Sequence, residues 1–148
     1  MNAVFHTLEI KLERLKEQII HLKDIQQTVK TPQDLEKDFK TEAVVERLFQ
    51  ISLEALLDIG RMIISIENLP RPEENDEIFK ILARAGIISE AYAKEAFGMG
   101  RFRNVLVHGY MIIDVNKVFE NLKRLDLFEK FVSFTSKYLT QKTITPSS

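Results

Sequence analysis

The stretch RNVLVHGY at residues 103–110 interleaves four polar side chains, those of Arg103, Asn104, His108 and Tyr110, with apolar ones. A histidine titrates near neutrality and can take a proton from a ribose 2′-hydroxyl or give one to a leaving oxygen. An arginine can stabilise negative charge that accumulates on phosphoryl oxygens, and Asn104 can orient the imidazole or the phosphate. These residue types suit cleavage of a phosphodiester, and the scheme requires no metal ion or other cofactor.

The spacing decides which of these side chains can act together. On a helix, Asn104 and His108 share a face, whereas Arg103 lies about 140° round the axis from His108. Tyr110 follows near the expected helix end. The set can converge on one ligand if the helix is distorted, or if a second chain closes the site across a two-fold axis.

Each motif residue also has an ordinary structural interpretation. A lone histidine on a partly apolar helix is most often structural, Arg103 alone is a surface charge, and Tyr110 alone is a core aromatic with a solvated hydroxyl. Only their occurrence together favours a functional interpretation. From residue 94 to residue 124, six basic residues face three acidic ones, which suits a phosphate-bearing ligand or an ordinary solvated surface.

A second polar cluster, formed by Glu46, Arg47 and Gln50, lies earlier in the chain. These residues can support the motif from behind, or they form a solvent-facing stripe. His6 and His21 lie off the nearest apolar seam and are expected in solvent. The chain has no cysteine, which excludes disulfides and thiolate metal sites, and the motif lacks a nearby second histidine or acidic cluster that would indicate a dedicated metal site.

Long apolar periodicities, broken by only five glycines and four prolines, predict that helices position these residues. A first helix is expected over residues 3–29. Thr31 followed by Pro32 predicts the start of a second helix that runs to about Glu67, with close packing or a bend at Gly60. The expected seam of the first helix is Leu8, Leu12, Leu15, Ile19 and Leu22, and the expected inner face of the second is Val44, Leu48, Ile51, Ala55, Ile59, Met62 and Ile66.

Three further helices are expected. A short one around residues 78–85 ends at Gly86 in a left-handed cap, and a fourth from about Glu90 contains the motif, although Gly98 and Gly100 weaken it. A fifth runs from an N-cap at Asp114 to about residue 138. Val105, Leu106 and Val107 are expected to anchor the motif helix. Short connections then predict an all-α, up-and-down bundle of four main helices plus one short helix.

The bulk composition is that of one globular domain. The chain has 148 residues, 45% of them apolar and 29% charged, with a net charge of −1. We expect a single helical domain over residues 1–140 and a polar tail over 141–148. No stretch has the pattern of a signal peptide or the length to span a bilayer, so a cytoplasmic location with no membrane partner is expected.

The motif matches R-N-x-x-x-H-x-Y, the signature of HEPN-domain proteins of the HepT type. The chain resembles that family beyond the motif, over roughly residues 3–135. The segments that carry the resemblance are ERLFQ at 46–50, PEENDEIFKILARAGIIS at 72–89 and FRNVLVHGYMIIDVNKVFENL at 102–122.

The resemblance implies a small all-helical toxin of a prokaryotic toxin–antitoxin pair. Such proteins form homodimers with a shared cleft and act as metal-independent endoribonucleases on RNA. Arg103 and His108 would be the catalytic pair, and Asn104 would support them. The family partner, a minimal nucleotidyltransferase of the MntA type, adds AMP to the motif tyrosine, here Tyr110. The alternative is a non-catalytic helical module that binds a nucleotide or a nucleotidyltransferase partner.

Overall fold

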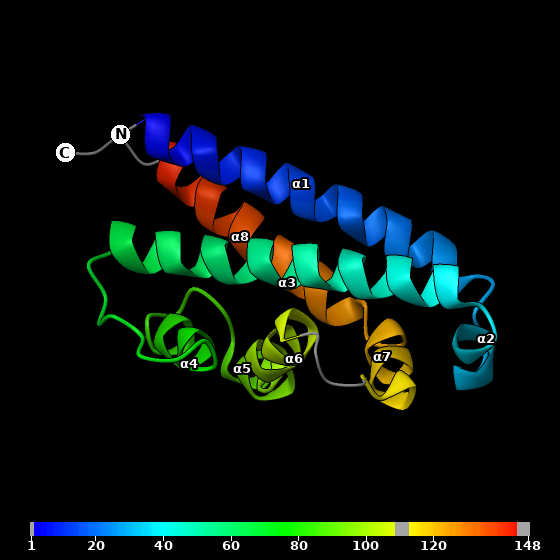
Figure 1. The fold of residues 1–148 in the computed structure, drawn as a ribbon. Coiled ribbons are helices and arrows are strands. Elements are labelled where there is room, and N and C mark those ends of the chain that lie inside the picture. Colours follow the sequence, from blue (N-terminus) through cyan, green and yellow to red (C-terminus); the bar gives the residue numbers. More distant parts are fainter. Residues whose placement is uncertain (1, 109–112, 145–148) are drawn as a thin grey trace.

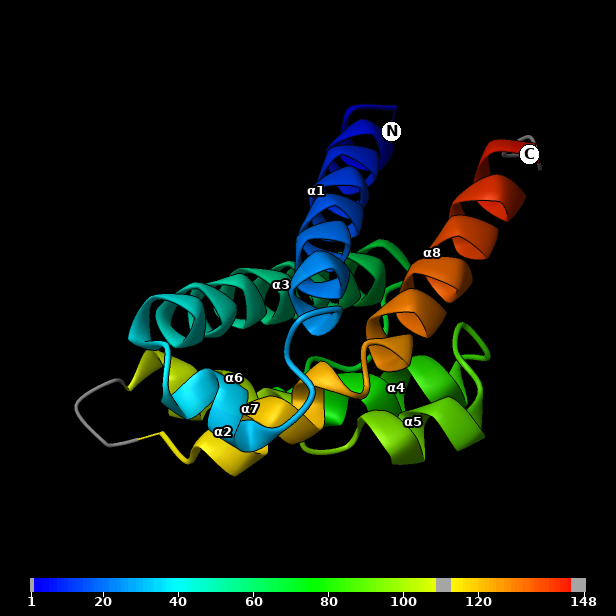
Figure 2. The ribbon, with the colours of Figure 1, turned by 90° about the vertical axis from the view of Figure 1, so that its right-hand side faces the viewer.

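The computed structural model describes residues 2–108 and 113–144, and every regular element in these ranges is a helix, as the all-α prediction requires. Long helices α1, α3 and α8 form the frame, and α4, α5, α6 and α7 lie beneath α3 and α8 (Figures 1 and 2). The eight described helices are α1 (Asn2–Gln26), α2 (Pro32–Glu36), α3 (Phe39–Ile66), α4 (Glu77–Arg84), α5 (Glu90–Ala96), α6 (Met99–Val107), α7 (Val115–Leu122) and α8 (Asp126–Ile144).

The first helix confirms its predicted seam. All five seam residues are buried, and α1 packs them against α3 and α8. His6 and His21 are exposed, as expected. Lys11 on α1 pairs with Asp58 on α3, so the seam has an ionic contact at its edge.

The predicted second helix is wrong at its start. Thr31 does cap a helix, because its hydroxyl accepts from the Asp34 N–H at 3.3 Å and the Asp34 carboxylate accepts from the Thr31 N–H at 3.1 Å. That helix is only α2, however. Asp38 then caps α3 by accepting from the Thr41 N–H at 3.3 Å. A second capping residue seven positions after the first marks the break.

The inner face predicted for this segment is also wrong. Val44 is 50% exposed, and of the predicted set only Ile59 is fully buried. Helix α3 packs against α1 on one side and against α4 and α6 on another, so two apolar faces overlap in its sequence and blur the period. Its buried side chains include Val45, Phe49, Leu53, Leu56, Leu57, Ile59, Ile63 and Ile64.

Close packing at Gly60 is confirmed. A Cβ at this position would lie 2.6 Å from Ile78 Cγ2, so α4 can approach α3 only where the side chain is missing. Gly86 has a φ of +75° just past α4, as its predicted role in a left-handed cap requires.

The last two predicted helices are each divided in two. The fourth is divided at Gly98 into α5 and α6, and the fifth ends at Leu122 before α8 begins. Asp114 does cap α7, accepting from the Asn116 N–H at 2.9 Å. The bundle of four main helices plus a short one is therefore replaced, within the described ranges, by three long helices and five short ones. Helix α8 continues to Ile144, into the predicted polar tail.

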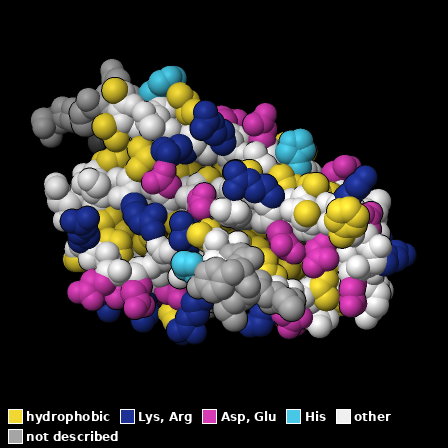
Figure 3. All heavy atoms as spheres, viewed as in Figure 1, with side chains coloured by type: hydrophobic (Ala, Val, Ile, Leu, Met, Phe, Trp, Pro, Cys, Tyr) yellow, Lys and Arg dark blue, Asp and Glu magenta, His cyan; other side chains and the backbone are white. Residues whose placement is uncertain are grey.

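The surface is mixed in charge. Lysine, arginine and acidic side chains alternate with apolar ones over the face seen in Figure 3. No helix in the described part of the chain is long and apolar enough to cross a membrane.

Candidate functional site

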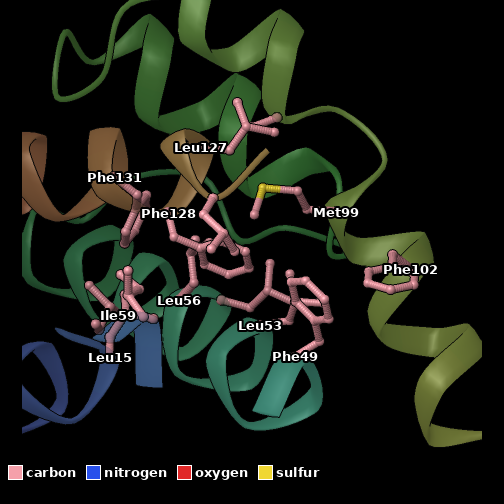
Figure 4. Close-up of a cluster of buried hydrophobic side chains, with 14 of the residues drawn as sticks. Leu15, Phe49, Leu53, Leu56, Ile59, Met99, Phe102, Leu127, Phe128 and Phe131 are labelled. Carbon is pink, nitrogen blue, oxygen red and sulfur yellow. The ribbon is translucent and has the colours of Figure 1, made fainter. Parts of the chain in front are cut away.

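Helix α6 presents the motif by burying one face. Met99, Phe102 and Leu106 are buried at helical spacing, and the Phe102 ring meets the Phe49 ring of α3 edge-on, with centroids 5.5 Å apart (Figure 4). Asn104 and His108 are both exposed on the other side. The predicted anchoring role is therefore confirmed for Leu106, whereas Val105 is 42% exposed because its position falls on the outer face.

The start of α6 is fixed by two glycines and one carboxylate. Gly98 has a φ of +103°, which favours glycine. A Cβ on Gly100 would lie 2.7 Å from Asn75 Cβ. Asp76 Oδ1 accepts from the Gly98 N–H at 3.3 Å and from the Gly100 N–H at 3.2 Å. The glycines do end the predicted long helix, but they do so by forming a tight joint with the loop before α4.

Arg103 lies on the flank of α6 that faces α3. Its guanidinium donates to Asn104 Oδ1 at 3.2 Å and lies 3.5 Å from Glu54 Oε1. The Arg103 side chain is 31% exposed, so this contact is partly shielded from solvent. Sequence reasoning missed Glu54. The available signal was its position one turn after Gln50, on the stripe that Glu46 begins.

His108 ends the motif helix. It is the C-cap of α6, with a φ of −85° and a ψ of 58°, and its backbone N–H donates to the Asn104 carbonyl at 3.0 Å. The predicted pairing of Asn104 with His108 therefore holds in the backbone, and both side chains reach the surface at the same end of α6. Tyr110 and Gly109 lie outside the described residues.

The cluster of Glu46, Arg47 and Gln50 stays apart from Arg103 and Asn104. Neither motif residue makes a hydrogen bond or an ion pair with any of the three. Arg47 is exposed, while Glu46 and Gln50 are half-buried. Burial raises the pKa of the Glu46 carboxyl, and the neighbouring Glu42 carboxylate raises it further.

The basic excess around the motif is partly compensated. Arg124 pairs with Glu95 at 2.8 Å and with Asp126 at 3.0 Å, and Arg101 lies 3.4 Å from Asp76. Lys94, by contrast, has no ion pair with a described residue. In the described ranges, no group of three or more histidine or acidic side chains is placed to hold a metal ion.

The sequence matches the family model described as Ribonuclease HepT-like over residues 3–134. It is 29% identical, over 133 residues and 89% of each chain, to a protein of Aphanizomenon flos-aquae named tRNA nuclease HepT. It is 27% identical to a Shewanella oneidensis protein named mRNA nuclease HepT, over 75% of this chain and 84% of that one.

A solved structure shares the fold. It is described as a tri-AMPylated Shewanella oneidensis HEPN toxin in complex with MNT antitoxin, and the alignment has a TM-score of 0.72 at 24% identity. The alignment covers 93% of this chain and 99% of that one.

Proposed function

This chain belongs to the HepT-like ribonuclease family, and we propose that it is an endoribonuclease whose catalytic pair is Arg103 and His108, supported by Asn104. The observation that carries the proposal is the family match over residues 3–134, which spans all of α6. The exposure of Asn104 and His108 supports it, because a polar substrate can reach both side chains.

The proposed chemistry uses the side chains of the motif without a metal ion. The His108 imidazole takes the proton of a ribose 2′-hydroxyl, whose oxygen attacks the adjacent phosphorus. The bond from phosphorus to the 5′-oxygen of the next nucleotide breaks, leaving a 2′,3′-cyclic phosphate, and a protonated histidine gives that oxygen its proton. Arg103 stabilises the charge that develops on the phosphoryl oxygens, while Asn104 and Glu54 orient its guanidinium.

We propose that two copies of the chain form this site. Two proton transfers at opposite ends of the reaction require two titrating groups, and a two-fold axis supplies a second His108. Val105 on α6 and Val44 on α3 are 42% and 50% exposed on two helices that pack together. A second copy would cover apolar surface of this kind.

We also propose that the chain is the toxin of a toxin–antitoxin pair, neutralised when a nucleotidyltransferase antitoxin of the MntA type adds AMP to Tyr110. Support comes from the description of the Shewanella structure as a tri-AMPylated toxin bound to an MNT antitoxin. Tyr110 lies two residues after the exposed His108, so an anionic group there would repel RNA phosphates at the motif. Intact mass after incubation with the antitoxin and ATP tests this, and AMP increments should disappear in Tyr110→Phe.

RNA cleavage in the presence of EDTA tests the enzymatic proposal. His108→Ala and Arg103→Ala should each abolish cleavage while the dimer remains folded. His21→Ala and Arg14→Ala, which remove exposed residues of the same types from α1, should cleave RNA like the unaltered protein. Full cleavage by a folded His108→Ala protein would contradict the mechanism. Tight antitoxin binding without any cleavage would instead favour the non-catalytic module.

A further inference from the structure

Phe97 is an aromatic side chain left in solvent beside the motif helix. It is the residue after α5, and its side chain is 47% exposed. Lys80 Nζ lies 5.6 Å from the centre of its ring, and Arg101 Cζ lies 5.4 Å from it. An exposed ring with cations on it combines a stacking surface with positive charge.

A groove of about 430 Å³ adjoins this ring between α4 and α5. Lys80, Arg84 and Lys94 line it together with Phe97, and Glu90 is the acidic residue of its lining. None of these three basic residues forms an ion pair with any part of the chain that the structure describes. The groove therefore has an excess of positive charge around one aromatic ring.

The groove leads to the motif along the outer face of α6. Arg101 is exposed on the first turn, one turn before Asn104, and His108 follows at the end of the helix. The distance from residue 101 to residue 108 along the axis is roughly 10 Å at the rise of an α-helix. One ligand chain can therefore contact both the ring and the catalytic histidine.

We propose that Phe97 and this groove bind a single-stranded stretch of the RNA substrate that flanks the scissile bond. A base stacks on the Phe97 ring, and phosphates lie against Lys80, Lys94 and Arg101. Sequence-tolerant binding of single strands uses this combination of an aromatic platform and basic side chains. The inference rests on the proposed ribonuclease function and adds a substrate contact outside the motif.

Binding of a short, unstructured, fluorescently labelled RNA oligonucleotide tests the site. Measured on protein that carries His108→Ala, so that the RNA stays intact, Phe97→Ala should weaken binding about tenfold, as loss of one stacked base does. Phe97→Tyr should bind like the parent. Lys80→Ala with Lys94→Ala should lower the slope of log affinity against log salt by about 1.4, or about 0.7 for each phosphate contact. Arg14→Ala with Lys30→Ala, away from the groove, should leave that slope higher.

The outcomes separate this inference from the function on which it rests. Cleavage by the His108-containing protein with unchanged oligonucleotide binding in Phe97→Ala overturns the groove alone. Loss of binding in Phe97→Ala, in a protein that never cleaves RNA, supports the groove and contradicts the ribonuclease. Free AMP that displaces the RNA at concentrations equal to its Kd would reassign the groove to a mononucleotide and overturn the proposal.

Discussion

Arg103 shows at the residue scale how the fold completes a motif. Helical spacing alone turns Arg103 away from His108, toward α3. There its guanidinium lies between Asn104 of the motif and Glu54, one residue inside the site and one outside it. Glu54 therefore acts as a positioning residue in the proposed reaction, since it touches the arginine and has no direct contact with the reacting atoms.

Glu54→Gln should lower kcat about two- to fivefold, because a half-exposed ion pair of this length contributes less than about 1 kcal/mol. KM should stay nearly the same, since the arginine keeps its charge and only its orientation loosens. Steady-state cleavage of a labelled RNA measures both constants. Glu17→Gln, an exposed change on α1, is the control. A Glu54→Gln protein that loses thermal stability and keeps its kcat would show a purely structural role.

Glu46 predicts a pH effect of the opposite kind to most surface carboxylates. Its raised pKa means that the folded protein disfavours the charged form, so ionised Glu46 costs stability at neutral pH. Glu46→Gln should raise the free energy of unfolding at pH 7 by less than about 1 kcal/mol. The gain should vanish as the pH falls below the ordinary value of 4.5. Denaturant titrations at both pH values, with Glu120→Gln as control, measure it, and an equal gain at both would exclude this cause.

At the scale of elements, the joint before α6 sets the direction of the motif helix. Gly100→Ala would place a methyl group against Asn75 and the Asp76 backbone, which should cost about 1–3 kcal/mol of stability. Gly98→Ala puts a side chain at a φ of +103° with open space around it, so only backbone strain is added there. Gly86→Ala adds the same strain at a φ of +75° after α4.

These three variants therefore separate strain from position. Gly98→Ala and Gly86→Ala should lower Tm by similar amounts, and Gly100→Ala should lower it further. RNA cleavage by protein that is still folded at the assay temperature should fall for Gly98→Ala and Gly100→Ala and stay unchanged for Gly86→Ala. Equal activity in all three would mean that the joint does not orient the site.

Local signals predicted more of this site than long-range ones did. Asn104, Leu106 and His108 follow from helical spacing, and Asp114 and Thr31 follow from capping chemistry, because each depends on residues within one turn. The break at Gly98 depends on Asp76, which lies 22 residues earlier in the chain. No periodicity within one helix contains that contact, nor the one between Glu54 and Arg103.

At the scale of the whole molecule, ion pairs join helices that hydrophobic packing brings together. Arg124, just before α8, donates to Glu95 of α5 and to Asp126 of α8, and Lys130 reaches the same two carboxylates. The hydrogen bond from Arg124 is the main cause that lowers the pKa of both Glu95 and Asp126. This network holds α5, and through Gly98 the motif helix, against the C-terminal helix.

Arg124→Ala should therefore lower Tm at pH 7 by an amount that depends on pH. A carboxylate whose folded pKa is lowered contributes stability that is present above its ordinary pKa and is lost as the pH falls through the folded value. The ordinary values are 4.5 for Glu95 and 3.8 for Asp126, so the difference in Tm from the parent should narrow progressively below about pH 4.5. Added salt should narrow it at pH 7 as well, because the network is largely exposed. Scanning calorimetry of Arg124→Ala and of Arg14→Ala across this range measures the effect. A Tm difference that is the same at pH 3 and at pH 7 would mean that the arginine stem stabilises α8 by packing, since packing does not titrate.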